Sequence, residues 1–577
     1  MSIRVVCTAL LLLVSSPQTP LAQTKIDPEA ATQTLHRQPV RADQFMIVAA
    51  NPLASQAGYA VLQDGGSAVD AAIAALLVLN VVEPQSSGLG GGGFALTWQA
   101  ADQALVSWDG RETAPQRAEP TMFLTPEGKP MAFFDAVTGG RSTGVPGLPA
   151  LLQALHTAQG HLAWQRLFAP AIRLASDGFP VSPRLASLLD RYQEALIQNP
   201  DTKALFFHEN GAPYQQGDIL KNPALAKTLE ALSKGADFYD RPFSTALSNA
   251  AGPDLTPQDF TNYRVKQRPA VCITAFDHDI CGMGPPSSGG VTVGQILGIL
   301  SHFPVRALER PELWSSYAQA SALAYADRAA YLADADFTAV PVNGLLTPHY
   351  LALRARLIDP RQPTPDARRP GTPPWWQGRI PPLDASQEKP GTTHVSVIDA
   401  QGNAIALTAS IETAFGSRRV AMGMLLNNQL TDFSFLPAKN NHPVANAAAP
   451  GKRPRSSMAP TLVFRHNTAG KTLAAVTGSP GGSRIIGYVA RTLLAHLALG
   501  HDPQTAINQP HLTHHNTGHI AIEDRRDADA LAEKLAALGY TIKRRDMVSG
   551  LHMIAVDPNG VLIGAADPRR EGIALGD

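Results

Sequence analysis

The chain has 577 residues, of which 44% are hydrophobic and 17% are charged, and its 48 basic residues balance its 48 acidic residues. A chain of this length and apolar content can bury an extensive core. Because the net charge is zero, no overall field favours nucleic acid or a membrane surface, and we expect soluble partners or small-molecule substrates.

The N-terminus has the features of a secretory signal. Arg4 precedes an apolar run over residues 5–14, which is too short to span a bilayer, and small residues follow around Ala22. Residues 1–22 are therefore predicted to be a signal peptide, and the mature protein is expected to be periplasmic or secreted, without a membrane anchor.

A buried helix is predicted over residues 67–82, where Ser67 can cap the N-terminus and Asp70 can complete a capping box. The glycine-rich run 88–93 then fits a GxGxxG pattern. A dinucleotide site needs a strand before the glycines and a helix after them, whereas here the order is reversed. We predict instead a tight crossing of backbones near the hairpin described below.

Arg111 follows an apolar strand predicted at 104–108 and lies in the loop DGRETAP. Loops at strand ends often carry ligand-binding side chains, and a planar guanidinium suits two-point contact with a carboxylate. The alternative is an ordinary solvated arginine.

The two cysteines that remain after signal removal, Cys272 and Cys281, stand at equivalent positions on the strands of a predicted hairpin. In an oxidising compartment they would suit a cross-strand disulfide. Alternatively, they are two small buried side chains that stay reduced.

Helices are predicted within 145–254 and over 294–302 and 312–334, where apolar residues recur at three- and four-residue spacing. The segment 359–391 is rich in proline, which forbids regular helices and central strands. We expect this segment to be mobile and to tolerate a chain break at its end.

A β-hairpin is predicted from the alternating runs 392–398 and 404–411, joined by a four-residue loop. This register pairs position 392 with 411 and places Ser410 diagonally beside Thr392. Two hydroxyls would then meet at the start of the strand, either as a nucleophile and its partner or as an ordinary cross-strand pair.

Eight motifs in this order resemble the γ-glutamyltransferase family of the N-terminal nucleophile hydrolase superfamily, over about residues 46–570. They are PQSSGLGGGGF (84–94), DGRETAP (109–115), GPPSSGG (284–290), AYADRAAYL (324–332), TTH (392–394), NNQLTDFS (427–434), KRPRSSMAP (452–460) and TGSPGGSR (477–484). The resemblance implies an α+β fold, a four-layer αββα sandwich. It also implies a precursor that is cut into a large subunit, 23–391, and a small catalytic subunit, 392–577, which form a heterodimer.

The resemblance implies that the chain cuts itself between Gly391 and Thr392. The new α-amine, with a reference pKa of roughly 7.7–8.0, would then serve as the base for the Thr392 hydroxyl. Thr393 is the alternative nucleophile. An acyl-transfer site also needs oxyanion donors, and the backbone amides of Gly481 and Gly482 are predicted at the start of a helix near residue 483.

Substrate roles also follow from the resemblance. Arg111, Ser456 and Ser457 would hold an α-carboxylate, while Gln429 and Asp432 would hold an α-amine. Each has an ordinary alternative, such as capping a turn or lying in a loop.

Three positions depart from the family pattern. Ser410 stands where many members have threonine, but it keeps the hydroxyl. Glu412 stands where many have asparagine beside the amine, so it either strengthens ammonium binding or signals another acyl group. The lid loop, 435–451, is short and has no aromatic residue after Phe435, which would leave the site open.

The C-terminal region adds packing elements. His511, His515 and His519 recur at four-residue spacing, but neighbouring Pro and Gly oppose the helix that would align them, so no metal and no cofactor are expected. A helix at 527–540 and a hairpin at 552–567 follow, and the hairpin is expected to extend the catalytic sheet.

The sequence thus predicts an autoprocessing γ-glutamyltransferase or hydrolase that acts on glutathione and related γ-glutamyl compounds and passes the acyl group to water or an acceptor amine. One alternative is a cephalosporin or glutaryl-type acylase on the same scaffold. A second, from another class, is an unprocessed periplasmic binding protein.

Overall fold

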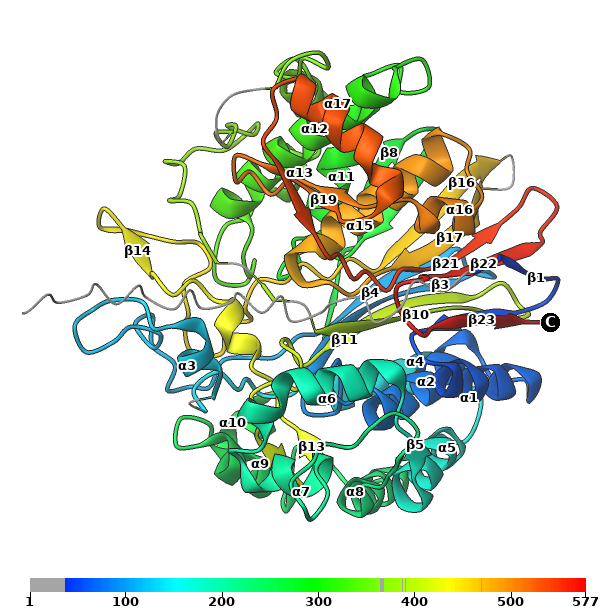
Figure 1. The fold of residues 1–577 in the computed structure, drawn as a ribbon, viewed down its shortest axis with the longest axis vertical. Coiled ribbons are helices and arrows are strands. Elements are labelled where there is room, and N and C mark those ends of the chain that lie inside the picture. The colour runs from blue at the N-terminus through cyan, green and yellow to red at the C-terminus, as the bar shows by residue number, and fades with distance from the viewer. Residues whose placement is uncertain (1–36, 139, 364–367, 387, 390, 468–469) are drawn as a thin grey trace, which may run out of the picture.

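The computed structural model describes residues 37–138, 140–363, 368–386, 388–389, 391–467 and 470–577. The predicted signal peptide lies outside them. Two seven-stranded sheets lie face to face, and helices cover the outer face of each (Figure 1). The predicted α+β sandwich of four layers is therefore present, with one apolar core cluster on either side of the sheet that contains residue 392.

That sheet, which we call the hairpin sheet, has the predicted hairpin at its centre. Its strands, in spatial order, are β23 (Ile573–Gly576), β2 (Met46–Ala49), β10 (Thr392–Ile398), β11 (Ala404–Ser410), β3 (Gly92–Gln99), β4 (Ala104–Gly110) and β7 (Lys266–Arg268). Every residue of β10 and β11 is buried. Both faces of the hairpin are covered, so the alternating pattern in its sequence does not mark a solvent side.

The second sheet contains the C-terminal hairpin, so the prediction that this hairpin extends the catalytic sheet is wrong. The strand order is β1 (Val40–Ala42), β22 (Leu562–Ala566), β21 (His552–Val556), β17 (Gly470–Gly478), β16 (Thr461–Asn467), β9 (His278–Gly282) and β8 (Val271–Ala275). Strand β17 pairs with β16 on one side and with β21 on the other. Strand β23 joins the hairpin sheet instead, through β2.

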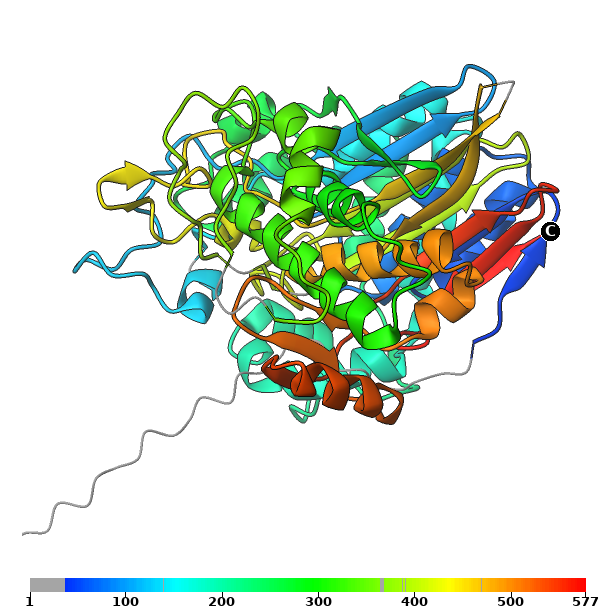
Figure 2. The same cartoon turned by 90° about the horizontal axis from the view of Figure 1, so that it is seen from above.

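The helices segregate into two outer layers, which Figure 2 shows from above. Those beneath the hairpin sheet include α1 (Pro52–Gln63), α2 (Ala68–Val82), α4 (Leu148–Gln159), α5 (Trp164–Asp177), α6 (Pro183–Leu196) and α8 (Pro223–Ser233). Those over the second sheet include α11 (Gly289–Leu300), α12 (Arg310–Tyr331), α15 (Ile485–Leu493), α16 (Pro503–Asn508) and α17 (Asp529–Ala537). The predicted capping box of Ser67 and Asp70 is present at the start of α2. Among the described residues, no helix is long and apolar enough to cross a membrane.

Shorter elements complete the fold. The helices are α3 (Phe133–Thr138), α7 (Pro200–Phe206), α9 (Phe243–Ala251), α10 (Pro257–Asn262), α13 (Val342–Leu345) and α14 (Pro348–Ala355). The strands are β5 (Phe179–Pro180), β6 (Ile219–Leu220), β12 (Val420–Ala421), β13 (Met424–Leu425), β14 (Ala438–Lys439), β15 (His442–Pro443), β18 (Leu512–Thr513), β19 (Ile520–Glu523) and β20 (Ile542–Arg545).

The register of the central hairpin differs by one position from the predicted register. Thr392 pairs directly with Ser410 instead of lying diagonally to it. The connecting loop has five residues, because the Asp399 carboxylate accepts hydrogen bonds from the backbone N–H groups of Gln401 and Asn403 and so draws position 399 out of the strand. The two hydroxyls are therefore closer neighbours than the alternation alone implied.

The glycine run marks a close backbone approach, as predicted. A Cβ atom at Gly93 would lie 2.7 Å from the carbonyl oxygen of Thr408 on β11, and one at Gly90 would lie 2.1 Å from that of Leu425. Neither oxygen can move without breaking the local backbone. Glycine is required here so that β3 and the preceding loop can pack against the hairpin.

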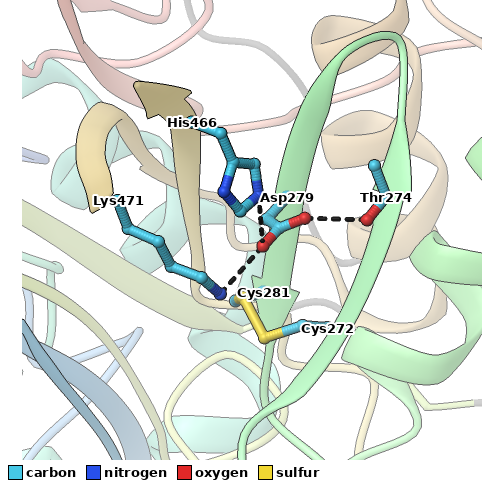
Figure 3. The surroundings of a disulfide bond; sticks show 6 residues. All are labelled: Cys272, Thr274, Asp279, Cys281, His466 and Lys471. Carbon is cyan, nitrogen blue, oxygen red and sulfur yellow. Dashed lines mark hydrogen bonds and ion pairs between the residues drawn. A yellow bond between two sulfur atoms is a disulfide. The ribbon is translucent and has the colours of Figure 1, made fainter. Parts of the chain in front are cut away.

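The second sheet carries a disulfide at its outer edge, between Cys272 on β8 and Cys281 on β9, whose Cα atoms are 4.1 Å apart. Beside it, Asp279 forms an ion pair with Lys471 (2.8 Å) and a hydrogen bond with His466 (3.0 Å) (Figure 3). These contacts join β9 to the hairpin β16–β17.

Candidate active site

Most of the predicted site residues line one cavity at the start of β10. They are Arg111, Thr392, Ser410, Glu412, Gln429, Asp432, Ser456, Ser457 and Gly482. They come from six separated parts of the chain, and the sandwich brings them together. Gly391 and Gly481 flank members of this set in sequence.

Thr392 and Ser410 form a hydroxyl pair at the base of the cavity. The Thr392 hydroxyl donates to Ser410 Oγ (3.2 Å), and Ser410 donates in turn to the carbonyl oxygen of Gly391 (2.8 Å). The backbone N–H of Glu412 also donates to Ser410 Oγ (2.8 Å). Ser410 is thereby fixed so that its proton polarises the peptide bond between Gly391 and Thr392.

Thr393, the alternative nucleophile, is not among the residues that line this cavity. Successive side chains of a strand point to opposite faces. Position 392 faces the cavity, so position 393 faces away from it.

The glycine turn contributes Gly482 to the lining of the cavity. Gly481 and Gly482 both have positive φ (132° and 57°), and a short 3₁₀ turn, Gly482–Arg484, leads into α15. A Cβ at Gly482 would lie 2.7 Å from the backbone of Lys389. The residues just before Thr392 therefore pass directly over this turn.

Arg111 and Asp432 form a buried ion pair on the cavity wall. Arg111 Nη2 donates to Asp432 Oδ2 (2.6 Å), and Gln429 Nε2 donates to the same oxygen (2.8 Å). Arg111 also donates hydrogen bonds from Nε to the carbonyl oxygen of Pro454 and from Nη2 to the carbonyl oxygen of Arg455. Burial raises the pKa of Asp432 to about 6, while Arg111 opposes this rise. The pair positions Asp432 but uses most of the donors of Arg111.

Glu412 adds a second carboxyl group beside Asp432. Its backbone has a φ of 80°, which is rare for a residue with a side chain. Its carboxyl oxygens accept from the backbone N–H of Lys389 (2.8 Å) and from Asn428 Nδ2 (2.9 Å). Burial and the neighbouring Asp432 carboxylate raise the pKa of Glu412 well above its usual range. Ionisation of both carboxyl groups at once is therefore unfavourable.

The serines of the KRPRSSMAP motif lie on the opposite wall. Ser456 Oγ accepts from the backbone N–H of Met458 (3.1 Å). Ser457 Oγ accepts from Arg328 Nη2 (2.8 Å), and Arg328 also forms an ion pair with Glu388. Sequence reasoning gave no role to Arg328, although it lies in the motif AYADRAAYL, and none to Glu388.

Part of the proline-rich segment packs against the rest of the protein through buried acidic side chains. Asp384 and Glu388 are 7% and 6% exposed. Asp384 pairs with Arg455 (2.8 Å), and the carbonyl of Glu388 accepts from the backbone N–H of Ser483 (3.4 Å). Buried ion pairs offset the lack of regular structure here.

Among the described residues, the short loop 435–451 does not contribute to the lining of the cavity. Strands β14 and β15 form a small hairpin that projects from the body of the protein (Figure 1). The ring of Phe435 stacks on that of Phe123, with 4.6 Å between centroids.

The histidines of the run 511–519, by contrast, contact different parts of the structure. His511 Nε2 lies 2.6 Å from Ser549 Oγ, and the ring of His515 stacks on that of Tyr325 with 4.4 Å between centroids. Within the described ranges, no group of three His, Cys, Asp or Glu side chains is placed to hold a metal ion.

Comparison with known proteins agrees with this geometry. The family model described as gamma-glutamyltranspeptidase matches residues 54–577. The chain belongs to this family. A glutathione hydrolase proenzyme of Bacillus subtilis (strain 168) is 36% identical over 550 residues, covering 92% of this chain and 91% of the relative. The protein is therefore an enzyme of the gamma-glutamyltranspeptidase family, whose relatives include proenzymes.

Acylases of this family are almost as similar. The acylase ACY 1 proenzyme of Pseudomonas sp. (strain SE83) is 32% identical over 561 residues, covering 94% of this chain and 96% of the relative. The solved structure of a cephalosporin acylase from Bacillus halodurans superposes with a TM-score of 0.81 at 24% identity, covering 98% and 99% of the two chains. This likeness establishes the shared fold, and the substrate class must be argued from the site itself.

Proposed function

We propose that the chain matures by cutting itself between Gly391 and Thr392, to give a large subunit, 23–391, and a small one, 392–577, which stay together as a heterodimer. The Thr392 hydroxyl attacks the Gly391 carbonyl carbon, the peptide nitrogen leaves as the new α-amine, and water then hydrolyses the resulting ester. The hydrogen bond from Ser410 to the Gly391 oxygen supports this step, because it places a donor where the oxyanion develops.

In the mature enzyme, the same hydroxyl attacks the γ-amide of a glutamyl compound such as glutathione, with the Thr392 α-amine accepting its proton. The leaving amine takes a proton, and an acyl-enzyme ester remains until water or an acceptor amine attacks it. The backbone amides of Gly481 and Gly482 are proposed as oxyanion donors. Their position at the turn before α15 supports this role.

The observation that favours a γ-glutamyl group is a surplus of hydrogen-bond acceptors in the cavity. Asp432 Oδ1 and Gln429 Oε1 are buried and receive no hydrogen bond from an N–H group or a hydroxyl of the described residues, although the Glu412 carboxyl group can share a proton with Asp432. Burying an unpaired polar group costs about 1–3 kcal/mol. An α-ammonium group would supply the missing donors, and an ionised Asp432 would neutralise its charge. Arg111, Ser456 and Ser457 are proposed to receive the adjoining α-carboxylate.

The test has two stages. Intact mass of the purified protein after incubation at neutral pH should show two chains, the smaller beginning at Thr392, and Thr392→Ala should remain a single chain. A wild-type chain that stays uncut would instead favour the unprocessed binding protein. Turnover should then be compared between γ-glutamyl and glutaryl p-nitroanilides, which differ only in the α-amine. We expect a clear preference for the γ-glutamyl compound.

A glutaryl-type acylase is the second candidate, and two observations favour it. Burial and the Asp432 carboxylate raise the pKa of Glu412 well above its usual range, which disfavours a second anion in the proposed amine site. The short loop 435–451, which does not line the cavity, would also leave room for bulky leaving groups, as an acylase requires. Equal or faster turnover of the glutaryl anilide would support this candidate. The signal peptide and a periplasmic or secreted location remain proposals from the sequence, which N-terminal sequencing of the exported protein would test.

A further inference from the structure

Glu388, four residues before the proposed nucleophile, is among the residues that line the cavity, together with Thr392 and Ser457. It forms an ion pair with Arg328 and lies 3.8 Å from Arg455 Nε. In the uncut chain an anion thus already occupies a position beside Ser457, one of the residues proposed to receive the substrate carboxylate.

Arg328 is built to hold this anion. It lies on α12, is 5% exposed, and donates from Nε to Ser288 Oγ (2.8 Å) and from Nη2 to Ser457 Oγ (2.8 Å). Among the described residues, Glu388 is the only carboxylate within ion-pair distance of Arg328. The adjacent Asp327 pairs with Arg354 instead. Arg328 is not itself among the residues that line the cavity, whereas its partners Glu388 and Ser457 are.

Arg328 and Arg455 both pair with carboxylates that come from the segment upstream of the proposed cut. Glu388 pairs with Arg328, and Asp384 pairs with Arg455 (2.8 Å). Departure of this segment would leave two buried guanidinium groups without carboxylate partners. An unpaired buried charge is strongly unfavourable, so these groups would favour an incoming anion.

Arg111 alone cannot supply the two-point contact that its residue type suggested. Its Nε and Nη2 are used by backbone carbonyls and Asp432, and only Nη1 has no hydrogen-bond partner among the described residues. A carboxylate has two oxygens, each of which can accept more than one hydrogen bond. Further donors must therefore come from another group.

We propose that Arg328, with Ser457 and Arg455, forms a carboxylate subsite that Glu388 fills in the precursor and that the α-carboxylate of the acyl donor fills in the mature enzyme. This inference rests on the proposed cleavage and on departure of Glu388 from the cavity. Before cleavage, the Glu388 carboxylate thus occupies the place of the substrate α-carboxylate. It keeps Arg328 and Arg455 paired with an anion until Thr392 becomes the new N-terminus.

The first test needs neither cleavage nor activity. In a Thr392→Ala precursor, Glu388→Ala should empty the subsite, and acetate should then raise the unfolding temperature in a concentration-dependent manner relative to chloride at equal ionic strength. Glu388→Gln, which fills the same space without charge, is the matched control and should not respond. Adding Arg328→Met to the Glu388→Ala variant should abolish the response. If acetate stabilises the alanine variant no more than the glutamine variant, the subsite does not exist.

The second test uses the mature enzyme and three p-nitroanilides. The γ-glutamyl and glutaryl compounds carry the carboxylate, whereas the 4-aminobutyryl compound keeps the amine and lacks the carboxylate. Loss of a charged hydrogen bond should lower kcat/KM of Arg328→Gln roughly 10- to 100-fold for the first two, and not for the third. Arg328→Lys should restore part of the loss. An equal fall for all three would mean that Arg328 only supports the fold, and an uncut chain would refute the cleavage while leaving the acetate result interpretable.

Discussion

Replacing Ser410 with alanine removes the group that links the proposed nucleophile to the peptide bond it would attack. In the structure Ser410 donates to the Gly391 carbonyl (2.8 Å) and accepts from the Thr392 hydroxyl (3.2 Å). Loss of one oxyanion donor of this kind costs about 2.7–4 kcal/mol of transition-state stabilisation, which is a factor of roughly 10² to 10³ in rate. We therefore expect Ser410→Ala to mature at least about a hundredfold more slowly than the wild type.

A short pulse of cell-free synthesis, followed by gel analysis of precursor and product at neutral pH, would give the rate of cleavage. The alanine variant also leaves the buried N–H of Glu412 without its acceptor, at a cost of about 1–3 kcal/mol in stability. Its unfolding temperature must therefore be measured in parallel. Ser410→Thr keeps the hydroxyl and should mature at a rate close to that of the wild type. A folded Ser410→Ala precursor that cleaves within about threefold of the wild-type rate would refute this reasoning.

Other predictions concern the cut, the amine site and the disulfide. Gly391→Ala should block or greatly slow maturation, because its Cβ would lie 1.9 Å from the Glu412 carbonyl oxygen, and intact mass would reveal the uncut chain. Binding of the α-amine requires ionised Asp432, whose pKa is raised to about 6, so below this value kcat/KM for the γ-glutamyl anilide should fall about tenfold per pH unit more steeply than kcat/KM for the glutaryl anilide, which has no α-amine. Asp432→Asn should lower that kcat/KM at neutral pH and bring it closer to the value for the glutaryl anilide; an undiminished preference would exclude Asp432 from the amine site. Cys272→Ser with Cys281→Ser should lower the free energy of unfolding by about 2–3 kcal/mol, and an unchanged denaturation midpoint would contradict this.

Local patterns in the sequence were sufficient to predict several elements. The capping box at Ser67 and Asp70 depends on side chains three residues apart, and the alternation after Thr392 depends on neighbours in one strand. The order of eight motifs identified the family and, with it, the residues that line the cavity. These features are encoded by short-range hydrogen bonding, by periodicity, or by residues that one chemistry requires together.

The tertiary structure decided what depended on distant parts of the chain. A side chain in the connecting loop, Asp399, shifts the hairpin by one position and sets Ser410 directly opposite Thr392. Pairing with β17 places the C-terminal hairpin in the second sheet, and no local pattern distinguishes one sheet edge from another.

The ion pair between Arg328 and Glu388 is the clearest example of such a long-range effect. The two residues are 60 positions apart, on a buried helix and in a segment without regular structure. Sequence determined which groups the chain possesses and which short elements they form. Only packing of the sandwich determined which of these groups are desolvated side by side, and electrostatic interactions become strong enough to govern function only when the groups are buried together.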